Sequence, residues 1–383
     1  MNCKQIIAEN QNWIDDTWKK LDKKLSRIAV KSRYKIPYTT INGEHDDHSK
    51  GGDILWWTNG FWGGLMWIMY VGTQKEDYKI TAEEQEKLLD GAFHYMHDWH
   101  HDVGFMWHLT SGVNYRLTGN EASKNRNLLA AMSLMSRYNV DGNYIRCWNG
   151  YRDGESVAGW TIIDCMMNMP LLYWASKEIG DKRFTRIAMR HADMSMRAHV
   201  REDGSVNHIV VHDTEKADAM LGVKAGQGYA ADSCWARGAS WALYGFTLSY
   251  MHTQADRYLE TAKKVANYFI QETEKTGWLP RLDFRQPDEP LYYDSTAGAI
   301  AACGLIELAK ITVRAESEKY LSAALNILQT MEKKWCDWTE QEDSILQMGS
   351  VKYNKEQHIP IIYGDYFFAE AILKLKGDEF LAW

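Results

Sequence analysis

Two kinds of helical segment alternate along this chain, and that alternation constrains the fold more than any other feature. One kind is amphipathic and rich in charge, as in residues 258–270, whereas the other is apolar on every side, as in residues 60–67 and 295–304. A helix that is hydrophobic all round must be buried, and an amphipathic helix covers it. The 3.6-residue periodicity predicts helices at 4–28, 59–72, 81–99, 104–118, 122–139, 160–178, 182–200, 235–252, 256–274, 294–312, 316–334 and 364–376.

Six pairs of one covering helix and one buried helix can close into a ring. Dividing the 383 residues by the six pairs gives about 64 residues per hairpin, a plausible unit for a repeat of this type. We therefore predict an all-α fold, a single (α/α)6-barrel domain over residues 1–383 with minor β-hairpins in its long loops. Residues 204–212 and the segment 346–353 carry the strand signals.

The lengths of the connections predict where the functional site lies. Links from a buried helix to the next covering helix are short, such as 119–121 and 180–181. Most links into the buried helices are long, and long loops on one face of a rigid scaffold usually build binding sites. The long links are 29–58, 140–159, 201–234, 275–293 and 335–363. The site is expected at the mouth where the buried helices begin.

Charge and cysteine usage exclude several classes of partner. The net charge is -7 and no basic run is present, which argues against nucleic-acid or membrane partners. The first residues lack the apolar core of a signal peptide, and no apolar run approaches the roughly 18 residues of a membrane helix. Six scattered cysteines without a CxxC pair fit reduced thiols, so a cytoplasmic location is expected.

Two aspartates are candidates for acid–base chemistry. Asp164 lies in the apolar stretch 160–170, read as the start of a buried helix, and Asp102 follows His100 and His101 at the start of another. Burial raises the pKa of a carboxyl group, and two carboxylates in one mouth hold their pKa values apart. Both could instead be helix caps or salt-bridge partners, since structural ion pairs also perturb pKa values.

Tryptophans near the starts of the buried helices favour a sugar-binding mouth, although buried tryptophan more often belongs to the core. They are Trp57, Trp148, Trp235 and Trp241. Arg237, two residues after Trp235, could complement an anionic ligand. The histidines at 97 and 101 have i, i+4 spacing, but no HExxH pattern is present. We therefore expect neither a metal nor another cofactor.

Several motifs together resemble those of the unsaturated glucuronyl hydrolases, glycoside hydrolase family 88, from about Trp56 to Glu370. They are His100-His101-Asp102-Val103-Gly104-Phe105, Ile162-Ile163-Asp164-Cys165, Asn168-Met169-Pro170-Leu171-Leu172, Trp235-Ala236-Arg237-Gly238 and Tyr363-Gly364-Asp365-Tyr366. The family consists of cytoplasmic (α/α)6 barrels. Their substrates are lyase-released oligosaccharides that carry a C4=C5 unsaturated uronic acid at the non-reducing end.

The resemblance implies roles for individual residues. Asp164 would be the general acid and base, protonating C4 and activating the water that adds at C5, while Asp102 would hold the sugar ring and modulate Asp164. The substrate-binding positions it implies are Trp57, Trp148, His208, Gln227, Arg237 and Trp241, to which we add Trp235 and Tyr366 from the motifs. Family members that prefer sulfated substrates use a Ser- and Lys-bearing loop, and Ser350 and Lys352 match it; a solvated surface hairpin is the alternative for that loop.

The expected partner is an unsaturated oligosaccharide, bound by a monomer or homodimer. One alternative is the related unsaturated rhamnogalacturonyl hydrolase family, which acts on pectin fragments. A second is an N-acylglucosamine epimerase-type barrel, which would use paired histidines such as His101 and His208 as acid and base. A third is an inactive sugar-binding barrel. Fold alone cannot separate these alternatives.

Overall fold

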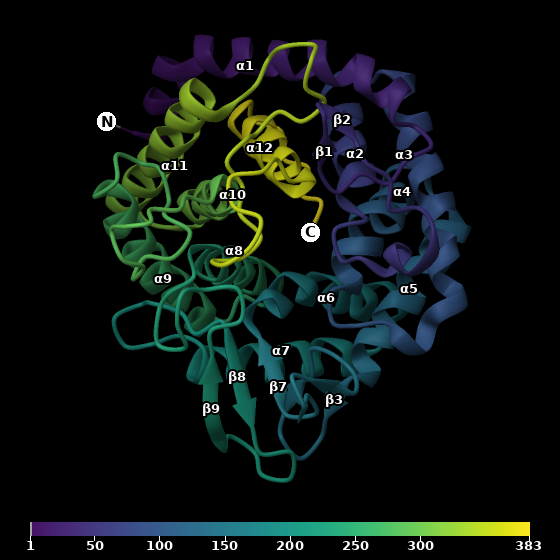
Figure 1. Cartoon of the computed structure of the whole chain (residues 1–383), viewed down its shortest axis with the longest axis vertical. Coiled ribbons are helices and arrows are strands. Elements are labelled where there is room, and N and C mark those ends of the chain that lie inside the picture. The colour runs from purple at the N-terminus through teal and green to yellow at the C-terminus, as the bar shows by residue number, and fades with distance from the viewer. Residues whose placement is uncertain (1) are drawn as a thin grey trace.

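The computed structural model describes residues 2–383, and its helices form two concentric layers (Figure 1). The inner elements are α2 (Phe61–Thr73), η3 (Gly104–Gly112) running into α4 (Val113–Thr118), η4 (Ile163–Asn168) running into α6 (Met169–Ile179), α8 (Ala236–Thr253), α10 (Ser295–Ile311) and α12 (Ile362–Leu375). The outer helices are α1 (Cys3–Lys31), α3 (Glu76–Leu89), α5 (Glu121–Ser136), α7 (Lys182–Ala198), α9 (Asp256–Glu274) and α11 (Arg314–Trp335). The predicted alternation of covering and buried helices is confirmed.

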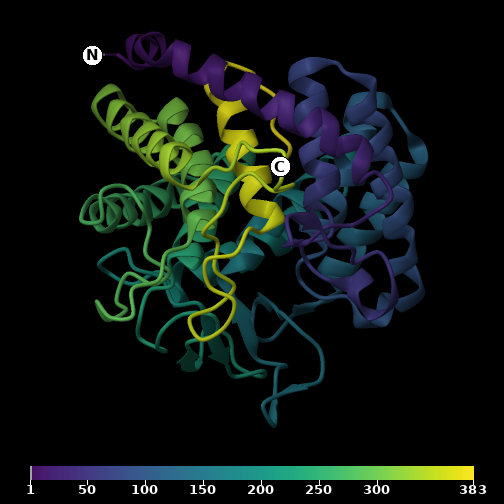
Figure 2. The same ribbon diagram turned by 45° about the horizontal axis from the view of Figure 1, so that its top comes forward.

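The inner elements form a closed ring. Each packs against the next in chain order, and α12 returns to pack against α2. In the outer layer α1 packs against α3, α11 and α12, so the two ends of the chain meet; Figures 1 and 2 both show the purple α1 beside yellow-green α11 and yellow α12. This closure confirms the predicted (α/α)6 barrel.

Small residues let the inner elements approach one another closely. A Cβ atom at Gly60 would lie 2.1 Å from the Phe105 carbonyl oxygen, and one at Gly304 would lie 2.2 Å from a Leu243 methyl carbon. Real Cβ contacts are longer than this, so only glycine fits against the backbone at position 60, and a larger residue at position 304 would displace the Leu243 side chain. The small residues seen in the apolar segments therefore set the spacing of the inner ring.

The segment 160–178 departs from its prediction as one continuous helix. Residues Trp160–Ile162 form strand β7, and the 3-10 turn η4 follows before α6 begins at Met169. Pro170 explains the late start, because proline has no N–H for an interior helical hydrogen bond but is tolerated in the first turn. Asp164 therefore lies in a short 3-10 segment between a strand and a helix.

Two further predicted segments also differ from their expected form. The predicted helix 81–99 divides into α3, which ends at Leu89, and the 3-10 segment η2 (Asp90–Asp98). The strand signal at 346–353 gives isolated bridges between Gly349 and Ile359 and between Lys352 and Lys355. Another short 3-10 helix, η1 (Gly51–Leu55), precedes α2.

The β-structure lies in the long loops, as predicted. Strands β7, β8 (Ile209–His212) and β9 (Met220–Lys224) form an antiparallel sheet in the order β7-β8-β9, beyond the helices at the lower end of Figure 1. Two-stranded hairpins are β1 (Thr40–Ile41) with β2 (Glu44–His45), β3 (Tyr138–Asn139) with β4 (Tyr144–Ile145), and β5 (Tyr151–Arg152) with β6 (Glu155–Ser156). None of the helices within residues 2–383 has both the length and the apolar character needed to cross a membrane.

Candidate active site

Two buried aspartates, Asp102 and Asp164, lie at the start of neighbouring inner elements. Asp102 occupies the turn before η3, Asp164 occupies the first turn of η4, and η3 packs against η4. The Asn168 amide Nδ2 donates to Asp102 Oδ1 at 3.3 Å and to the Asp164 carbonyl oxygen at 3.4 Å. The Phe105 backbone N–H donates to Asn168 Oδ1 at 3.1 Å, which fixes the orientation of the amide. The structure therefore brings the two predicted carboxylates into one site.

The connection through Asn168 depends on the absence of a side chain at position 104. A Cβ atom at Gly104 would lie 2.5 Å from Asn168 Oδ1, so glycine is needed for this approach of η3 to η4. The sequence prediction assigned no role to Asn168 or Gly104, although both lie within the motifs. The spacing of four residues between Asp164 and Asn168, about one helical turn, was the available signal.

His101 is the main group that favours the ionised form of Asp102, and His100 lies beside the same carboxylate. His101 Nδ1 donates to the Cys147 carbonyl oxygen at 2.9 Å, and its Nε2 lies 3.1 Å from Asp102 Oδ1. His100 Nδ1 lies 3.5 Å from Asp102 Oδ2. Burial by itself would raise the pKa of Asp102, but the charge and hydrogen bond of His101, followed by His100 and Asn168, outweigh burial and hold that pKa below its ordinary value.

The pKa of Asp164 is shifted in the opposite direction. Burial and then the nearby charge of Asp102 raise the pKa of Asp164 to about 7. Its Oδ1 has no hydrogen-bond partner among the described residues and lies 3.7 Å from His208 Nε2. Burial lowers the pKa of His208 to about 3, so this imidazole is neutral near pH 7. Asp102 and Asp164 therefore combine an ionised carboxylate, that of Asp102, with a carboxyl group, that of Asp164, which can give or take a proton near neutral pH.

Trp57, which precedes α2, lies in a cluster of aromatic rings. Trp57 is half-buried and packs against Tyr363 and Phe105, with ring centroids 5.0 and 5.5 Å apart. Trp241 is fully buried, and its ring centroid lies 6.4 Å from that of Trp57. Of the two predicted binding residues, Trp57 is thus the ring with exposed surface, and Trp241 supports it.

Tyr366 lies deeper in the barrel than predicted. Its ring is fully buried and packs against Phe61, Phe367 and Trp383, at centroid distances of 5.3, 5.0 and 6.2 Å. The Tyr366 side chain points into the core because α12 is buried along its whole length. We therefore place Tyr366 in the packing beneath the site and not among the substrate contacts.

Arg237 connects the site to the loop of residues 349–352, which contains Ser350 and Lys352. Its Nη1 forms a 2.5 Å ion pair with Asp294 and donates to the Ser350 carbonyl oxygen at 2.6 Å, while Nη2 donates to the Val351 carbonyl oxygen at 2.8 Å. The guanidinium stacks over Trp235 at 4.5 Å, and its Nε has no partner among the described residues. Most of its donors are therefore satisfied within the protein, and its charge reaches Asp164 as a secondary influence on that pKa.

Gln227 holds the other side of the 349–352 loop, and His208 lies next to Gln227. Gln227 Nε2 donates to the Val351 carbonyl oxygen at 2.7 Å, and the Gln227 backbone N–H donates to His208 Nδ1 at 3.0 Å. Trp235 lies between this pair and Arg237, with its ring 4.1 Å from the His208 ring. The structure therefore brings His208, Gln227, Trp235 and Arg237 together with Asp164.

The two residues of the predicted sulfate loop differ in exposure. The Ser350 hydroxyl is buried and donates to the Tyr293 carbonyl oxygen at 2.6 Å, so it is engaged in holding the loop. Lys352 is exposed, two residues further on. Of this pair, only Lys352 presents its polar group to solvent.

His100, His101 and Asp102 have ligand atoms within 4.8 Å of one another, as a metal site would require. Each histidine, however, already uses one nitrogen within the protein, because His100 Nε2 donates to the Leu55 carbonyl oxygen at 2.9 Å and His101 donates to Cys147. The Asp102 backbone N–H donates to the remaining His100 nitrogen at 3.2 Å. The cluster is thus built to orient the Asp102 carboxylate.

Comparison with known proteins identifies the family. No protein-family model matches the chain. Over 331 residues the chain is 34% identical to the unsaturated glucuronyl hydrolase of Bacillus sp. strain GL1, which covers 84% of this chain and 86% of the relative. The chain belongs to the unsaturated glucuronyl hydrolase family.

Further members of this glycoside hydrolase family support the assignment. The unsaturated chondroitin disaccharide hydrolase of Streptococcus pneumoniae is 32% identical, covering 85% of this chain and 83% of the relative. The crystal structure of the Bacillus enzyme matches with a TM-score of 0.87 at 30% identity, covering 94% of this chain and 97% of that one. A Streptococcus agalactiae unsaturated glucuronyl hydrolase with an Asp-to-Asn substitution, solved with dGlcA-GalNAc6S, matches with a TM-score of 0.80 at 26% identity, covering 97% and 93%.

Proposed function

We propose that this protein removes the C4=C5 unsaturated uronic acid from the non-reducing end of glycosaminoglycan oligosaccharides released by polysaccharide lyases. The observation that carries the proposal is the carboxyl pair joined through Asn168, in which the pKa of Asp164 is raised to about 7 and the pKa of Asp102 is lowered. Hydration of an enol ether needs a group that can both donate and accept a proton near neutral pH. The glycosaminoglycan substrates named for the relatives support the choice of substrate class.

In the proposed reaction the Asp164 carboxyl group donates its proton to C4 of the double bond. Water then adds at C5, and the Asp164 carboxylate takes a proton from that water, so the catalyst is regenerated. The resulting hemiketal at C5 opens to a ketone, and the group that remains at C1 is a hemiacetal that releases the next sugar. The balance is one water consumed for one glycosidic bond broken.

The surrounding residues would orient the uronate. Asp102, fixed by His100 and His101, accepts hydrogen bonds from sugar hydroxyl groups, and its charge keeps the Asp164 proton in place. Trp57 and Trp148, both half-buried, offer ring faces for stacking, and for Trp148 this is the face opposite Arg152. Arg237, through its unpartnered Nε and its charge, together with His208 and Gln227, faces the anionic end of the sugar. Lys352 is a further candidate contact at the rim.

The pH dependence of kcat/KM should reflect the two opposed shifts. Asp164 must be protonated in order to act, so kcat/KM is expected to fall about tenfold per pH unit above pH 7. The low pKa of Asp102 keeps it ionised on the acid side, which extends the plateau downward. The measurement is kcat/KM from pH 4 to 9 with an unsaturated chondroitin disaccharide.

Asp102→Asn is the matched variant for this profile. It removes the like charge that is the second cause of the raised Asp164 pKa, so the alkaline limb of the residual activity should move to lower pH. An alkaline limb that stays in place in Asp102→Asn would contradict the assignment of that limb to Asp164.

The activity itself is tested by the ultraviolet absorbance of the conjugated C4=C5 uronate. Purified protein is incubated with unsaturated disaccharides from hyaluronan, chondroitin, sulfated chondroitin, heparin and rhamnogalacturonan. Loss of absorbance with a glycosaminoglycan set supports the proposal and names the substrate. Loss with the pectin fragment alone would move the protein to the rhamnogalacturonyl alternative, and no loss with any of them would overturn hydrolysis.

We also propose that the protein works in a reducing compartment such as the cytoplasm. All six cysteines are free thiols, and four of them are buried. Burial raises the pKa of Cys147, Cys165, Cys234 and Cys303, which keeps these thiols protonated and unreactive.

Size-exclusion chromatography with light scattering would test the predicted monomer or homodimer.

A further inference from the structure

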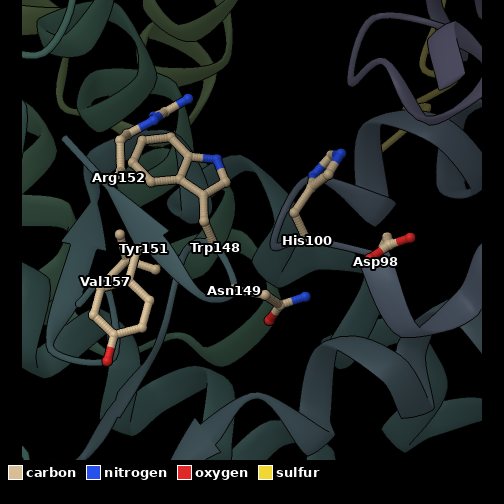
Figure 3. A pocket seen from close by; sticks show the side chains of 7 residues that line it. All are labelled: Asp98, His100, Trp148, Asn149, Tyr151, Arg152 and Val157. Atoms are coloured by element: carbon tan, nitrogen blue, oxygen red, sulfur yellow. The ribbon is translucent and has the colours of Figure 1, made fainter. Parts of the chain in front are cut away.

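A cavity of about 310 Å³ opens beside the carboxylate pair. Its walls include His100, Trp148, Asn149 and Arg152 (Figure 3). His100 Nδ1 lies 3.5 Å from Asp102, and the Trp148 ring lies 5.9 Å from the ring of His101, the other histidine on Asp102. The cavity is therefore next to the site where the uronate is proposed to bind, and a sugar joined to that uronate would enter it.

Arg152 gives this cavity an uncommitted positive charge. Its guanidinium stacks on the Trp148 ring at 3.9 Å from the ring centroid, while within residues 2–383 no carboxylate is paired with it. A guanidinium stacked on an indole ring still has free N–H groups, because these point outward in the plane of the guanidinium. They can therefore donate hydrogen bonds to a ligand. The stack also limits side-chain motion, so less entropy would be lost when an anion binds.

The hairpin that carries Arg152 is anchored on both sides. Across the hairpin, the Glu155 carboxylate is paired with Lys224 of β9 at 2.8 Å, and Lys224 lies over the Trp160 ring at 4.8 Å. At the base of the hairpin, the Val157 backbone N–H donates to the Gly150 carbonyl oxygen at 3.1 Å. Lys224 is thereby neutralised by Glu155, and Arg152 keeps its charge for the cavity.

The two ends of the cavity differ in charge, with Asp98 at one end and Arg152 at the other. Asp98 lies at the end opposite Arg152 in Figure 3 and is paired with His97 at 3.1 Å. The Asn149 amide Nδ2 donates to the carbonyl oxygens of His97 and Trp99. An anionic group would be repelled from the Asp98 end and attracted to the Arg152 end, which fixes how a charged sugar can lie between them.

From this arrangement we propose that Arg152 is a specificity-determining residue that binds a sulfate group on the sugar next to the unsaturated uronate. A planar guanidinium matches the paired oxygens of such a group. The structure points to Arg152 rather than Ser350, whose hydroxyl is engaged with Tyr293. The inference rests on the proposed function, because the sugar that enters this cavity is the leaving group of that reaction.

The test compares two unsaturated chondroitin disaccharides that differ only in a 6-sulfate on the N-acetylgalactosamine. The wild-type ratio of kcat/KM for the sulfated substrate to kcat/KM for the unsulfated substrate is expected to be above one. Arg152→Gln should reduce this ratio about tenfold, which is the usual effect of losing one charge-assisted contact. The change should come mainly from a higher KM for the sulfated substrate. Arg186→Gln on α7 is the matched control, since Arg186 is also exposed and forms no ion pair within residues 2–383. The ratio measured with this variant should stay at the wild-type value.

A binding measurement separates this inference from the proposed function. Calorimetry with Asp164→Asn, which cannot turn over substrate under the proposal, should show tighter binding of the sulfated disaccharide, and Arg152→Gln in that background should remove the difference. Turnover with an unchanged ratio in Arg152→Gln, or a ratio that falls in Lys352→Gln instead, would overturn the role of Arg152 and leave the hydrolase proposal standing. If no disaccharide is turned over, the hydrolase proposal fails, and the binding difference alone decides whether Arg152 forms an anion site.

Discussion

Asp164→Asn is expected to lower kcat/KM by about 10³-fold or more, because asparagine keeps the volume of the side chain and has no proton to transfer. Asp164 Oδ1 is buried without a hydrogen-bond partner among the described residues, so the substitution breaks no hydrogen bond at that atom. The measurement is the loss of uronate absorbance under single-turnover conditions, with circular dichroism to confirm the fold. Retention of more than a few per cent of the wild-type rate would remove Asp164 from the mechanism.

The same variant should be at least as stable as the wild type at pH 8. The folded carboxyl group has its pKa raised to about 7, whereas an unfolded aspartate titrates near about 3.9. The folded state therefore holds a proton that the unfolded state has released, and the wild type loses stability as pH rises between these values. Asparagine does not titrate, so its unfolding midpoint in urea should not show this loss.

Asp365→Asn is the matched control. Burial also raises the pKa of Asp365 to about 7, but this carboxylate accepts the backbone N–H groups of Ile345 and Leu346, at 2.9 and 2.6 Å, away from the carboxylate pair. An asparagine offers one acceptor oxygen for those two donors, so Asp365→Asn should lose stability. Its kcat, measured on the folded fraction, should remain close to the wild-type value, which would show that a raised pKa alone does not make a carboxyl group catalytic.

Arg237→Ala is expected to destabilise the fold by about 3–5 kcal/mol, the usual cost of removing one partner of a buried ion pair. Both partners are buried, and the variant would leave the Asp294 carboxylate without its cation. It would also release the carbonyl oxygens of Ser350 and Val351. Urea unfolding measures the stability. KM for an unsaturated disaccharide should also rise, because the variant lacks both the hydrogen bonds that hold the 349–352 loop and the positive charge near Asp164.

A double variant separates charge burial from loop positioning. Arg237→Met with Asp294→Asn removes both charges and keeps most of the volume, so it should recover part of the stability lost in Arg237→Ala. Its KM should stay high, since methionine cannot donate to the loop. Full recovery of KM in the double variant would contradict a role of Arg237 in holding the loop or the substrate.

Much of the fold was predictable because it depends on periodicity. The segments around residues 60–67 and 295–304 are apolar on every side, which permits only a buried helix, and the covering helices carry their charges on one face. The motifs around Asp102, Asp164 and Arg237 also gave the correct family. In each of these cases the information is local or is carried by residue type.

Contacts between distant segments were not predictable in the same way. Asn168 was assigned no role, although its amide connects Asp102 to Asp164. Tyr366 was expected at the mouth and lies in the core, and Ser350 was expected to bind sulfate and uses its hydroxyl to hold the loop. Arg152, exposed on a two-stranded hairpin, carried no sequence signal at all.

The sequence by itself determined the alternation of helices and the chemistry-bearing residue types, because hydrophobic periodicity acts within one segment at a time. Only the tertiary structure decided which carboxyl group keeps its proton. The pKa of Asp164 depends first on burial by the surrounding barrel and then on the charge of Asp102, which lies 62 residues earlier in the chain. Desolvation and charge interactions depend on distances in space, and those distances exist only after the ring has closed.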